Sequence, residues 1–262
     1  MRALAPPRGR PLSRKCCSLH LLPQFWEELD AGKELAQGKS IADSAKAAGL
    51  EHVVFSSLED TRQLNKDGKL AQGEPLAPLS DPEGEAWVVP HFDAKGAIRA
   101  HMLDIGLPAT FVQLSCYPDN LLGGLKPQVQ EDGSRALAIP MADKATGWVA
   151  VADTGGSVLT ILKDREAHLG KTYGLAGDNI TTEELTATLS EVTGQTFKYA
   201  PVPMEVFAGF GFPGADDMAR MFGALYCVPE HCPRDPEQTR KLNPATQSVR
   251  QWAEANKEAL LA

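Results

Sequence analysis

Two residues with reactive side chains, His91 and Lys95, lie four positions apart in a segment whose pattern predicts a helix over residues 91–106. A spacing of four places both side chains on one face of a helix. A histidine exchanges protons near neutral pH, so this face carries the groups that acid–base chemistry needs. The alternative interpretation is a solvated lysine and a histidine that only starts the helix.

A second group of polar residues lies at the end of a predicted strand over residues 109–117: Tyr117, Pro118, Asp119 and Asn120. Open parallel sheets bind ligands at the carboxyl ends of their strands. These four residues are therefore candidates for a ligand-binding loop. Pro-Asp-Asn is also a good turn sequence, so a plain turn is the alternative.

The elements that would position these residues alternate between helix and strand. The patterns predict a helix over residues 27–48 that ends at Gly49, a strand over 52–58, an irregular stretch over 59–90, and then the helix and strand named above. This alternation implies crossover connections and a parallel sheet. The predicted fold class is α/β.

The second half of the chain has shorter elements. We expect strands at residues 135–140, 148–152 and 196–202, a helix capped by Asp153, and a helix that begins with a Thr181–Glu184 capping box and ends at Gly194. Further helical segments lie near 203–210, 215–227 and 247–260. Together they predict a small α/β lobe that forms one wall of a cleft, with a core that includes Phe207, Phe210, Phe212 and Phe222.

Composition excludes several classes of function. A formal charge of −8 over 262 residues argues against binding to the phosphate backbone of nucleic acid. No apolar run approaches the ~18 residues of a membrane span. Five cysteines in irregular positions suggest a reducing compartment, so we expect a cytoplasmic protein, with the nucleus as an alternative. Cys227, His231 and Cys232 form only a weak zinc pattern, and we expect no metal site.

Residues 1–25 differ from the rest of the chain. They hold Arg2, Arg8, Arg10, Arg14 and Lys15 but no acidic residue, and four prolines interrupt any helix. We expect a disordered basic tail. A mitochondrial transit peptide and a secretory signal are weaker alternatives, because the prolines spoil an amphipathic helix and the apolar run is short.

Four segments, in this order, resemble proteins of the NmrA-like branch of the short-chain dehydrogenase/reductase superfamily: HVVFSSLED, the run from HFDAK to YPDNLL, GFPGADDMARMF and LNPATQSVRQW. The resemblance covers residues 26–262 and implies an NAD(P)-binding Rossmann fold, mainly over 26–125, with a smaller lobe, mainly over 126–262. It also implies binding of NADP(H) and a role as a redox-sensing regulator of transcription, although some members are quinone reductases.

One feature that the resemblance leads us to expect is missing. A Rossmann pyrophosphate site needs a strand, a glycine turn of the GxxGxxG kind and a helix start, and none precedes Trp26. We therefore expect an N-terminally truncated, incomplete Rossmann fold whose first strands are absent and whose NADP(H) binding is weak or lost. Gly155 and Gly156 have the wrong spacing to replace that turn. We also expect the 52–58 strand, or whatever precedes it, to become an exposed sheet edge.

The resemblance further implies roles for the residues named at the start. Lys95 would contact the nicotinamide end of the cofactor, His91 stands where related reductases have a catalytic tyrosine, and Tyr117 to Asn120 would contact NADP. A family lysine aligns with Ala36, and Lys39 would replace it only loosely.

Three functions stay open: a regulator that acts through protein contacts, an NADPH-dependent quinone oxidoreductase, or an inactive truncated product. Implied partners are regulatory proteins, argininosuccinate synthase, a second copy, or a complete family member.

Overall fold

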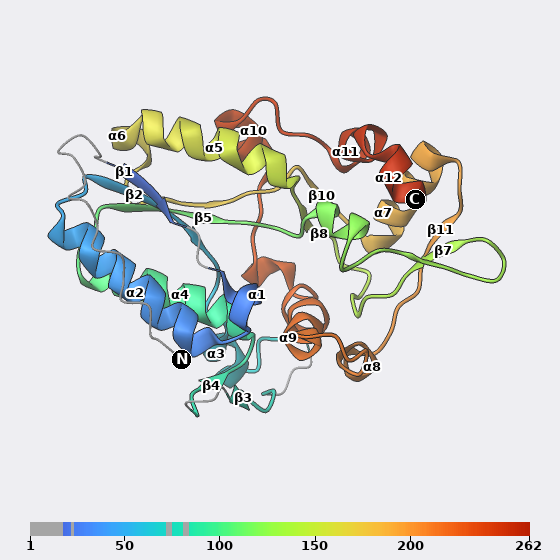
Figure 1. Cartoon of the computed structure of the whole chain (residues 1–262), viewed down its shortest axis with the longest axis horizontal. Helices are drawn as coiled ribbons and strands as arrows, with labels where there is room; N and C mark the ends of the chain where they lie inside the picture. Colours follow the sequence, from blue (N-terminus) through green and yellow to red (C-terminus); the bar gives the residue numbers. More distant parts are fainter. Residues whose placement is uncertain (1–17, 22–23, 72–74, 81–83) are drawn as a thin grey trace, which may run out of the picture.

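The main sheet of the protein has four parallel strands in the order β1-β2-β5-β9, in a computed structural model that describes residues 18–21, 24–71, 75–80 and 84–262. The strands are β1 (Ser18–Leu21), β2 (His52–Ser57), β5 (Ala109–Gln113) and β9 (Thr172–Gly174). Helices α2 (Ala31–Ala47) and α4 (Pro90–Asp104) cover one face, and α5 (Val151–Lys163) and α10 (Pro236–Leu242) cover the other (Figure 1). The predicted α/β fold with a parallel sheet is confirmed.

Strand β2 shows why the sheet needs helices on both faces. All six of its residues are buried, and successive side chains point to opposite sides. Val53 and Phe55 pack in the core beneath α2 and α4, whereas Val54 packs in the core beneath α5 and α10. A strand that is apolar on both faces is stable only between two helical layers.

Strand β1 corrects an expectation about the start of the chain. Ser18–Leu21 lies inside the stretch expected to be a disordered tail, yet it pairs in parallel with His52–Phe55. Strand β2 is therefore interior, and the end strand of the described sheet is β1, which agrees with the expected edge at residues 52–58 or whatever precedes them; the exposure of that edge stays a prediction. Only Leu21 of this strand is buried, so the strand contributes little apolar surface to the core. Its hydrogen-bond partners come from β2. Residues 1–17 lie outside the described residues.

The helix predicted over residues 27–48 is two helices, α1 (Phe25–Glu28) and α2. Leu29 separates them with a φ of 53°, a left-handed conformation that ends α1. Asp30 then caps α2 by accepting a hydrogen bond from the Lys33 N–H at 2.9 Å. Gly49, with a φ of 68°, ends α2 as predicted.

The stretch from 59 to 90 is less irregular than expected. It contains helix α3 (Thr61–Lys66) and the short antiparallel pair β3 (Leu79–Ser80) and β4 (Ala86–Trp87). Asp60 caps α3 by accepting from the Arg62 N–H at 3.1 Å. A six-residue helix has too few turns to show a clear periodicity in the sequence.

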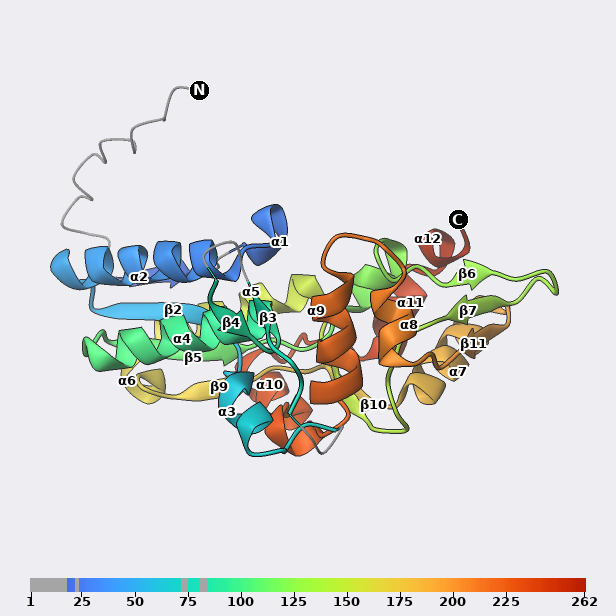
Figure 2. The ribbon, with the colours of Figure 1, turned by 90° about the horizontal axis from the view of Figure 1, so that it is seen from below.

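The smaller lobe lies beside the main sheet, on the right in Figure 1. Its strands are β6 (Gln128–Val129), β7 (Arg135–Leu137) and β11 (Phe197–Tyr199) in one sheet, and β8 (Thr146–Trp148) with β10 (Asp178–Ile180) in another. Its helices are α7 (Thr182–Thr193), α8 (Met204–Ala208), α11 (Val249–Ala255) and α12 (Lys257–Leu261), and α9 (Ala215–Arg220) follows α8 at the side of the lobe nearer the main sheet (Figure 2). The Thr181–Glu184 capping box and the left-handed Gly194 are confirmed.

Several shorter elements connect these parts: helix α6 (Arg165–His168), the 3-10 turns η1 (Pro118–Leu122) and η3 (Pro229–His231), and the π-helical segment η2 (Met221–Leu225) that continues α9. Figure 2 shows α9 standing between the main sheet and the smaller lobe. Of the four lobe phenylalanines, Phe207 and Phe222 are buried in the core, whereas Phe210 is exposed. None of the helices in the described ranges has the length and apolar character to cross a bilayer.

The two parts of the fold do not divide at one position of the chain. Strand β9 and helices α5 and α10 follow residue 126, yet they complete the main sheet and its second helical layer. Helix α5 also begins earlier than expected, at Val151, so Asp153 does not cap it. Asp153 lies in the first turn and accepts from the Gln247 N–H at 2.8 Å instead.

Gly155 and Gly156 lie inside helix α5, which agrees with the interpretation that they are not a phosphate loop. At Gly156 and at Gly38, close packing explains why a helix contains glycine. A Cβ atom on Gly156 would lie 2.6 Å from Asn243, and one on Gly38 would lie 2.3 Å from buried Ile98 of α4. At Gly155 a Cβ atom would meet nothing within 4 Å.

Gly38→Ala should therefore destabilise the protein by about 1–3 kcal/mol through overpacking between α2 and α4, although alanine favours helix. Gly155→Ala is the matched control and should stabilise by up to about 1 kcal/mol. Urea denaturation of both variants measures the difference. If both substitutions stabilise the protein, Gly38 of α2 is not packed closely against α4.

Candidate functional site

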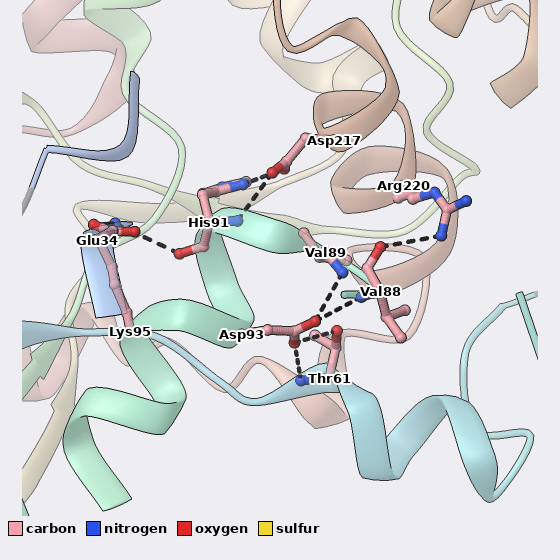
Figure 3. A network of polar contacts seen from close by, with 9 residues as sticks. All are labelled: Glu34, Thr61, Val88, Val89, His91, Asp93, Lys95, Asp217 and Arg220. Atoms are coloured by element: carbon pink, nitrogen blue, oxygen red, sulfur yellow. Dashed lines mark hydrogen bonds and ion pairs between the residues drawn. The ribbon is translucent and has the colours of Figure 1, made fainter. Parts of the chain in front are cut away.

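Helix α4 carries the candidate residues His91 and Lys95, and its first turns are buried inside the protein. Proline at the first helical position suits a helix start, because its missing N–H would have no partner there. The other N–H groups of a buried helix start need acceptors that water cannot supply. Side chains from three other elements meet this part of α4 (Figure 3).

Asp93 is the most completely bonded of these side chains. Its carboxylate accepts hydrogen bonds from the Thr61 N–H at 2.6 Å and hydroxyl at 2.7 Å, and from the N–H groups of Val88 at 2.7 Å and Val89 at 3.1 Å. It joins α4 to the start of α3 and to the segment before α4. The sequence analysis overlooked Asp93, although it lies within the HFDAK segment.

His91 is held by Asp217 of helix α9. One carboxylate oxygen of Asp217 accepts from the His91 N–H at 2.9 Å, and the other lies within hydrogen-bonding distance of the ring Nδ1. The His91 ring also packs against the rings of Phe25, Trp26 and Phe92, with centroids 5.8, 5.0 and 4.7 Å away. The ring is therefore fixed by both a carboxylate and aromatic neighbours.

Lys95 is paired with Glu34 of helix α2. Its ammonium lies 2.6 Å from the Glu34 carboxylate, and the two side chains are only 9% and 2% exposed. The ammonium also donates to the His91 carbonyl at 3.5 Å. Burial raises the pKa of the Glu34 carboxyl, while the Lys95 ammonium opposes this rise. Lys95 is thus a buried ion-pair partner, and the interpretation of a solvated charge is wrong.

The second oxygen of Glu34 is buried and has no hydrogen-bond partner among the described residues. The Lys95 ammonium has three donors, of which these contacts use two. The pair therefore places an unused acceptor close to an unused donor.

Tyr117, Pro118, Asp119 and Asn120 lie together at the carboxyl end of β5, as predicted, and three of them form η1 with the leucines that follow. Burial raises the pKa of Tyr117 to about 12. Asp119 accepts from the Val151 N–H at 3.0 Å and so caps helix α5, while Asn120 is exposed. Within the described ranges, none of these residues has a hydrogen bond or ion pair with His91 or Lys95. The other candidate positions, Ala36 and Lys39, are exposed on α2.

A further buried ion pair joins two distant segments of the chain, and no local pattern predicts it because its members are 175 residues apart. The Arg234 guanidinium donates to both oxygens of Glu59 at 2.6 and 3.1 Å and, through Nε, to the Leu114 carbonyl at 3.0 Å. Burial alone would lower the pKa of Arg234, but Glu59 raises it above its ordinary value.

The thiols near this ion pair are poor nucleophiles. Burial raises the pKa of Cys116 to about 12, and it raises that of Cys232 well above the ordinary value. Only a thiolate reacts readily or binds metal. In the described part of the chain, Cys227, His231 and Cys232 do not gather into a group that would hold a metal ion.

One cavity of about 250 Å³ borders the site. Pro90 and Asp217, on either side of His91, line it together with Phe25, Leu29 and Trp87, among others. Gly214 also lines it and belongs to the only G-x-G-x-x-G spacing in the sequence, Gly209, Gly211 and Gly214. This spacing follows helix α8 and precedes the six-residue helix α9, so it lacks the strand that a dinucleotide turn requires.

Residues 76–242, which include His91, Lys95, Tyr117 and Asp217, match the model of the NmrA-like family. This chain belongs to the NmrA-like family. It is 32% identical over 183 residues to the nitrogen metabolite repression protein nmr of Neurospora crassa, covering 67% of this chain and 34% of that protein. It is 29% identical over 205 residues to the NmrA-like oxidoreductase lnbB of Aspergillus flavus, covering 76% of this chain and 58% of that protein. The chain thus spans about a third to three-fifths of these curated relatives.

Solved structures show the same fold. The negative transcriptional regulator NmrA in complex with NADP has a TM-score of 0.67 and 22% identity, covering 87% of this chain and 72% of that one. The NADPH-dependent quinone oxidoreductase QOR2 of Escherichia coli has a TM-score of 0.66 and 21% identity, covering 91% and 76%. The predicted family and its Rossmann-type fold are confirmed, whereas the predicted truncation stays a prediction.

The raised pKa of Glu34 predicts a pH-dependent difference between the wild type and Glu34→Gln. The folded state keeps the Glu34 proton to a higher pH than the unfolded state, which loses it near about 4.3. Wild type therefore loses stability relative to the variant as the pH rises above about 4, through the raised folded pKa. Urea denaturation between about pH 4 and 8 measures this trend, with exposed Glu28→Gln as control. A difference that moves in the opposite direction would mean that Lys95 lowers the Glu34 pKa.

Proposed function

We propose that this protein is an NADP(H)-linked regulator of the NmrA type that responds to redox state and acts through contacts with other proteins. The proposal rests on how the two reactive groups on α4 are paired with other side chains. His91 and Lys95 are each bound by a buried carboxylate from another helix. A ligand that draws on either group must share or replace a buried carboxylate, which links ligand binding to the position of another helix.

Two further observations support a regulator. The relatives include nitrogen metabolite repression proteins of Neurospora crassa and Emericella nidulans. Among the described residues, the raised pKa values of Cys116 and Cys232 make oxidation of these two thiols a poor redox signal. A response to redox state then has its simplest origin in a bound nucleotide, and the solved NmrA structures include complexes with NAD and with NADP.

We further propose that the 262-residue chain binds NADP(H) weakly. A Rossmann site holds the pyrophosphate with backbone N–H groups of a glycine turn between a strand and a helix. The described residues contain no such strand–turn–helix unit with the required glycine spacing. Lys95 and the loop from Tyr117 to Asn120 would then serve only the nicotinamide end.

A second candidate function is NADPH-dependent reduction of quinones. It is favoured by the cavity beside the His91–Asp217 pair, whose walls include Phe25, Leu29 and Trp87 and suit a ring-shaped substrate. The fold likeness to the quinone oxidoreductase of Escherichia coli is in keeping with it. This reaction needs a bound and oriented cofactor, so weak NADPH binding counts against it.

The protein partners follow from the same proposal. Regulatory proteins, a second copy of this chain and a complete family member are the proposed partners. Argininosuccinate synthase and a nuclear location remain proposals that derive from the family resemblance.

Calorimetry with NADPH tests the nucleotide proposal. Each lost hydrogen bond to charged phosphate is worth about 1.5–3 kcal/mol, so losing two weakens binding by at least a hundredfold. We therefore expect no site tighter than about 100 μM. Micromolar binding or better would contradict the proposal and favour the quinone reductase.

A second experiment tests the role of Lys95. Removing Lys95 alone leaves the Glu34 carboxylate buried and unpaired, which destabilises a protein by about 3–5 kcal/mol. Removing Glu34 alone would likewise leave the Lys95 ammonium unpaired, so the comparison uses the wild type and Glu34→Gln/Lys95→Gln, in which both charges are removed together. Residual NADPH binding should fall several-fold in the double variant and stay unchanged in Lys39→Ala. Equal binding by all three proteins would make Lys95 purely structural.

A further inference from the structure

Asp217 joins helix α9 to helix α4 and also contacts two different atoms of His91, one in the backbone and one in the ring. The carboxylate accepts the backbone N–H of His91 at 2.9 Å with one oxygen and contacts the ring Nδ1 with the other. The two side chains are only 4% and 7% exposed, so water does not compete for either contact. The residues are 126 positions apart and come from different parts of the fold.

This contact determines which ring nitrogen carries the proton. An ionised carboxylate only accepts hydrogen bonds, so the Nδ1 that faces it must donate. A neutral imidazole has one N–H, and if Nδ1 holds it, Nε2 carries a free lone pair. The rings of Phe25, Trp26 and Phe92 pack against the imidazole and hinder a turn about its Cβ–Cγ bond, which would put Cδ2 in the place of Nδ1 beside Asp217.

We propose that Asp217 is the positioning residue of His91, which keeps the proton on Nδ1 and leaves Nε2 as the nitrogen that a ligand meets. The ligand would lie in the neighbouring cavity of about 250 Å³, which is lined by Pro90, the residue before His91, and by Asp217, which contacts His91. A lone pair on Nε2 selects a ligand group that donates a hydrogen bond, such as an amide N–H or a hydroxyl. This role rests on the proposed function, since it presumes that the α4 site binds a ligand.

The neighbouring residue Asp216 shows that Asp217 is not explained by helix formation alone. Both aspartates lie in the first turn of α9, where a negative charge favours a helix start. Asp216 forms no ion pair with the residues that the structure describes; it is exposed and, like Asp217, lines the cavity, so both changes remove a charge at the cavity wall. Asp217 is buried, and both of its carboxylate oxygens contact His91. The pair thus offers a matched comparison: the same charge on the same turn, with and without the contact.

The variant Asp217→Asn separates positioning from support of the fold. The amide oxygen of asparagine still accepts the His91 N–H, so the start of α4 keeps an acceptor. The amide NH2 now faces Nδ1 and donates to it, which forces the ring proton onto Nε2. The substitution therefore inverts the tautomer while nearly preserving the shape.

Nuclear magnetic resonance of the full chain labelled with ¹⁵N-histidine distinguishes the two tautomers. Spectra are recorded at about pH 8, above the ordinary histidine pKa of about 6.5, and His91→Gln identifies the His91 signals. We expect the Nδ1–H form in the wild type and in Asp216→Asn, and the Nε2–H form in Asp217→Asn. An Nε2–H form in the wild type, or the same tautomer in all three proteins, would overturn the proposal.

Titration with NADP⁺ then tests whether the position of the proton affects binding. We expect Asp217→Asn to bind at least about threefold more weakly than Asp216→Asn, which carries the same change of charge. Equal affinities would overturn the role of Asp217 in positioning His91 for a ligand. Absence of binding by the wild type would instead overturn the proposed function, while the tautomer result would still decide how Asp217 acts on the ring.

Discussion

The rest of the site depends on one constraint: helix α4 begins inside the protein, where its first N–H groups have no water to bond. An unpaired buried N–H costs about 1–3 kcal/mol, so each requires an acceptor. Asp217 supplies one for His91, and Asp93 turns back to accept from Val88 and Val89 just before the helix. Because Asp93 also accepts from Thr61, and Asp217 comes from α9, the start of α4 becomes the point where three parts of the fold meet.

The burial of this part of α4 also determines how Lys95 interacts with the rest of the protein. A buried ammonium is tolerated only with a partner, and Glu34 provides it at 2.6 Å. That pairing does not prevent Lys95 from meeting a ligand, because an ammonium has three donors and the carboxylate occupies one. The unused oxygen of Glu34 lies at the same place. A donor and an acceptor side by side match a hydroxyl group, which both donates and accepts, and ribose carries such groups.

The parts of the fold that the sequence predicts well are those with local causes. The Thr181–Glu184 capping box, the left-handed Gly194 and the apolar run of β2 each lie within one short segment. The failures are non-local. Strand β1 has little apolar surface and exists because β2 pairs with it, and β9 joins the main sheet by pairing with Phe111–Gln113 of β5. The pairs His91–Asp217 and Glu34–Lys95, 126 and 61 residues apart, appear only when the chain is folded.

Proteins described as a transcriptional regulator and as a quinone oxidoreductase share this fold, so the fold alone does not distinguish the two functions. Each reactive group here is tied to a helix other than its own: Lys95 to α2 and His91 to α9. A ligand that draws either group away must break a buried contact, and the freed carboxylate must then move or find a new donor. Occupancy of the site is thereby coupled to the position of two helices, one on the main sheet and one between the sheet and the smaller lobe (Figure 2). Two exposed aromatic residues lie next to these helices: Trp26 on α1, just before α2, and Phe210 in the loop before α9. A shift of α2 or α9 would therefore change the surface that a partner protein meets, which is useful in a regulator.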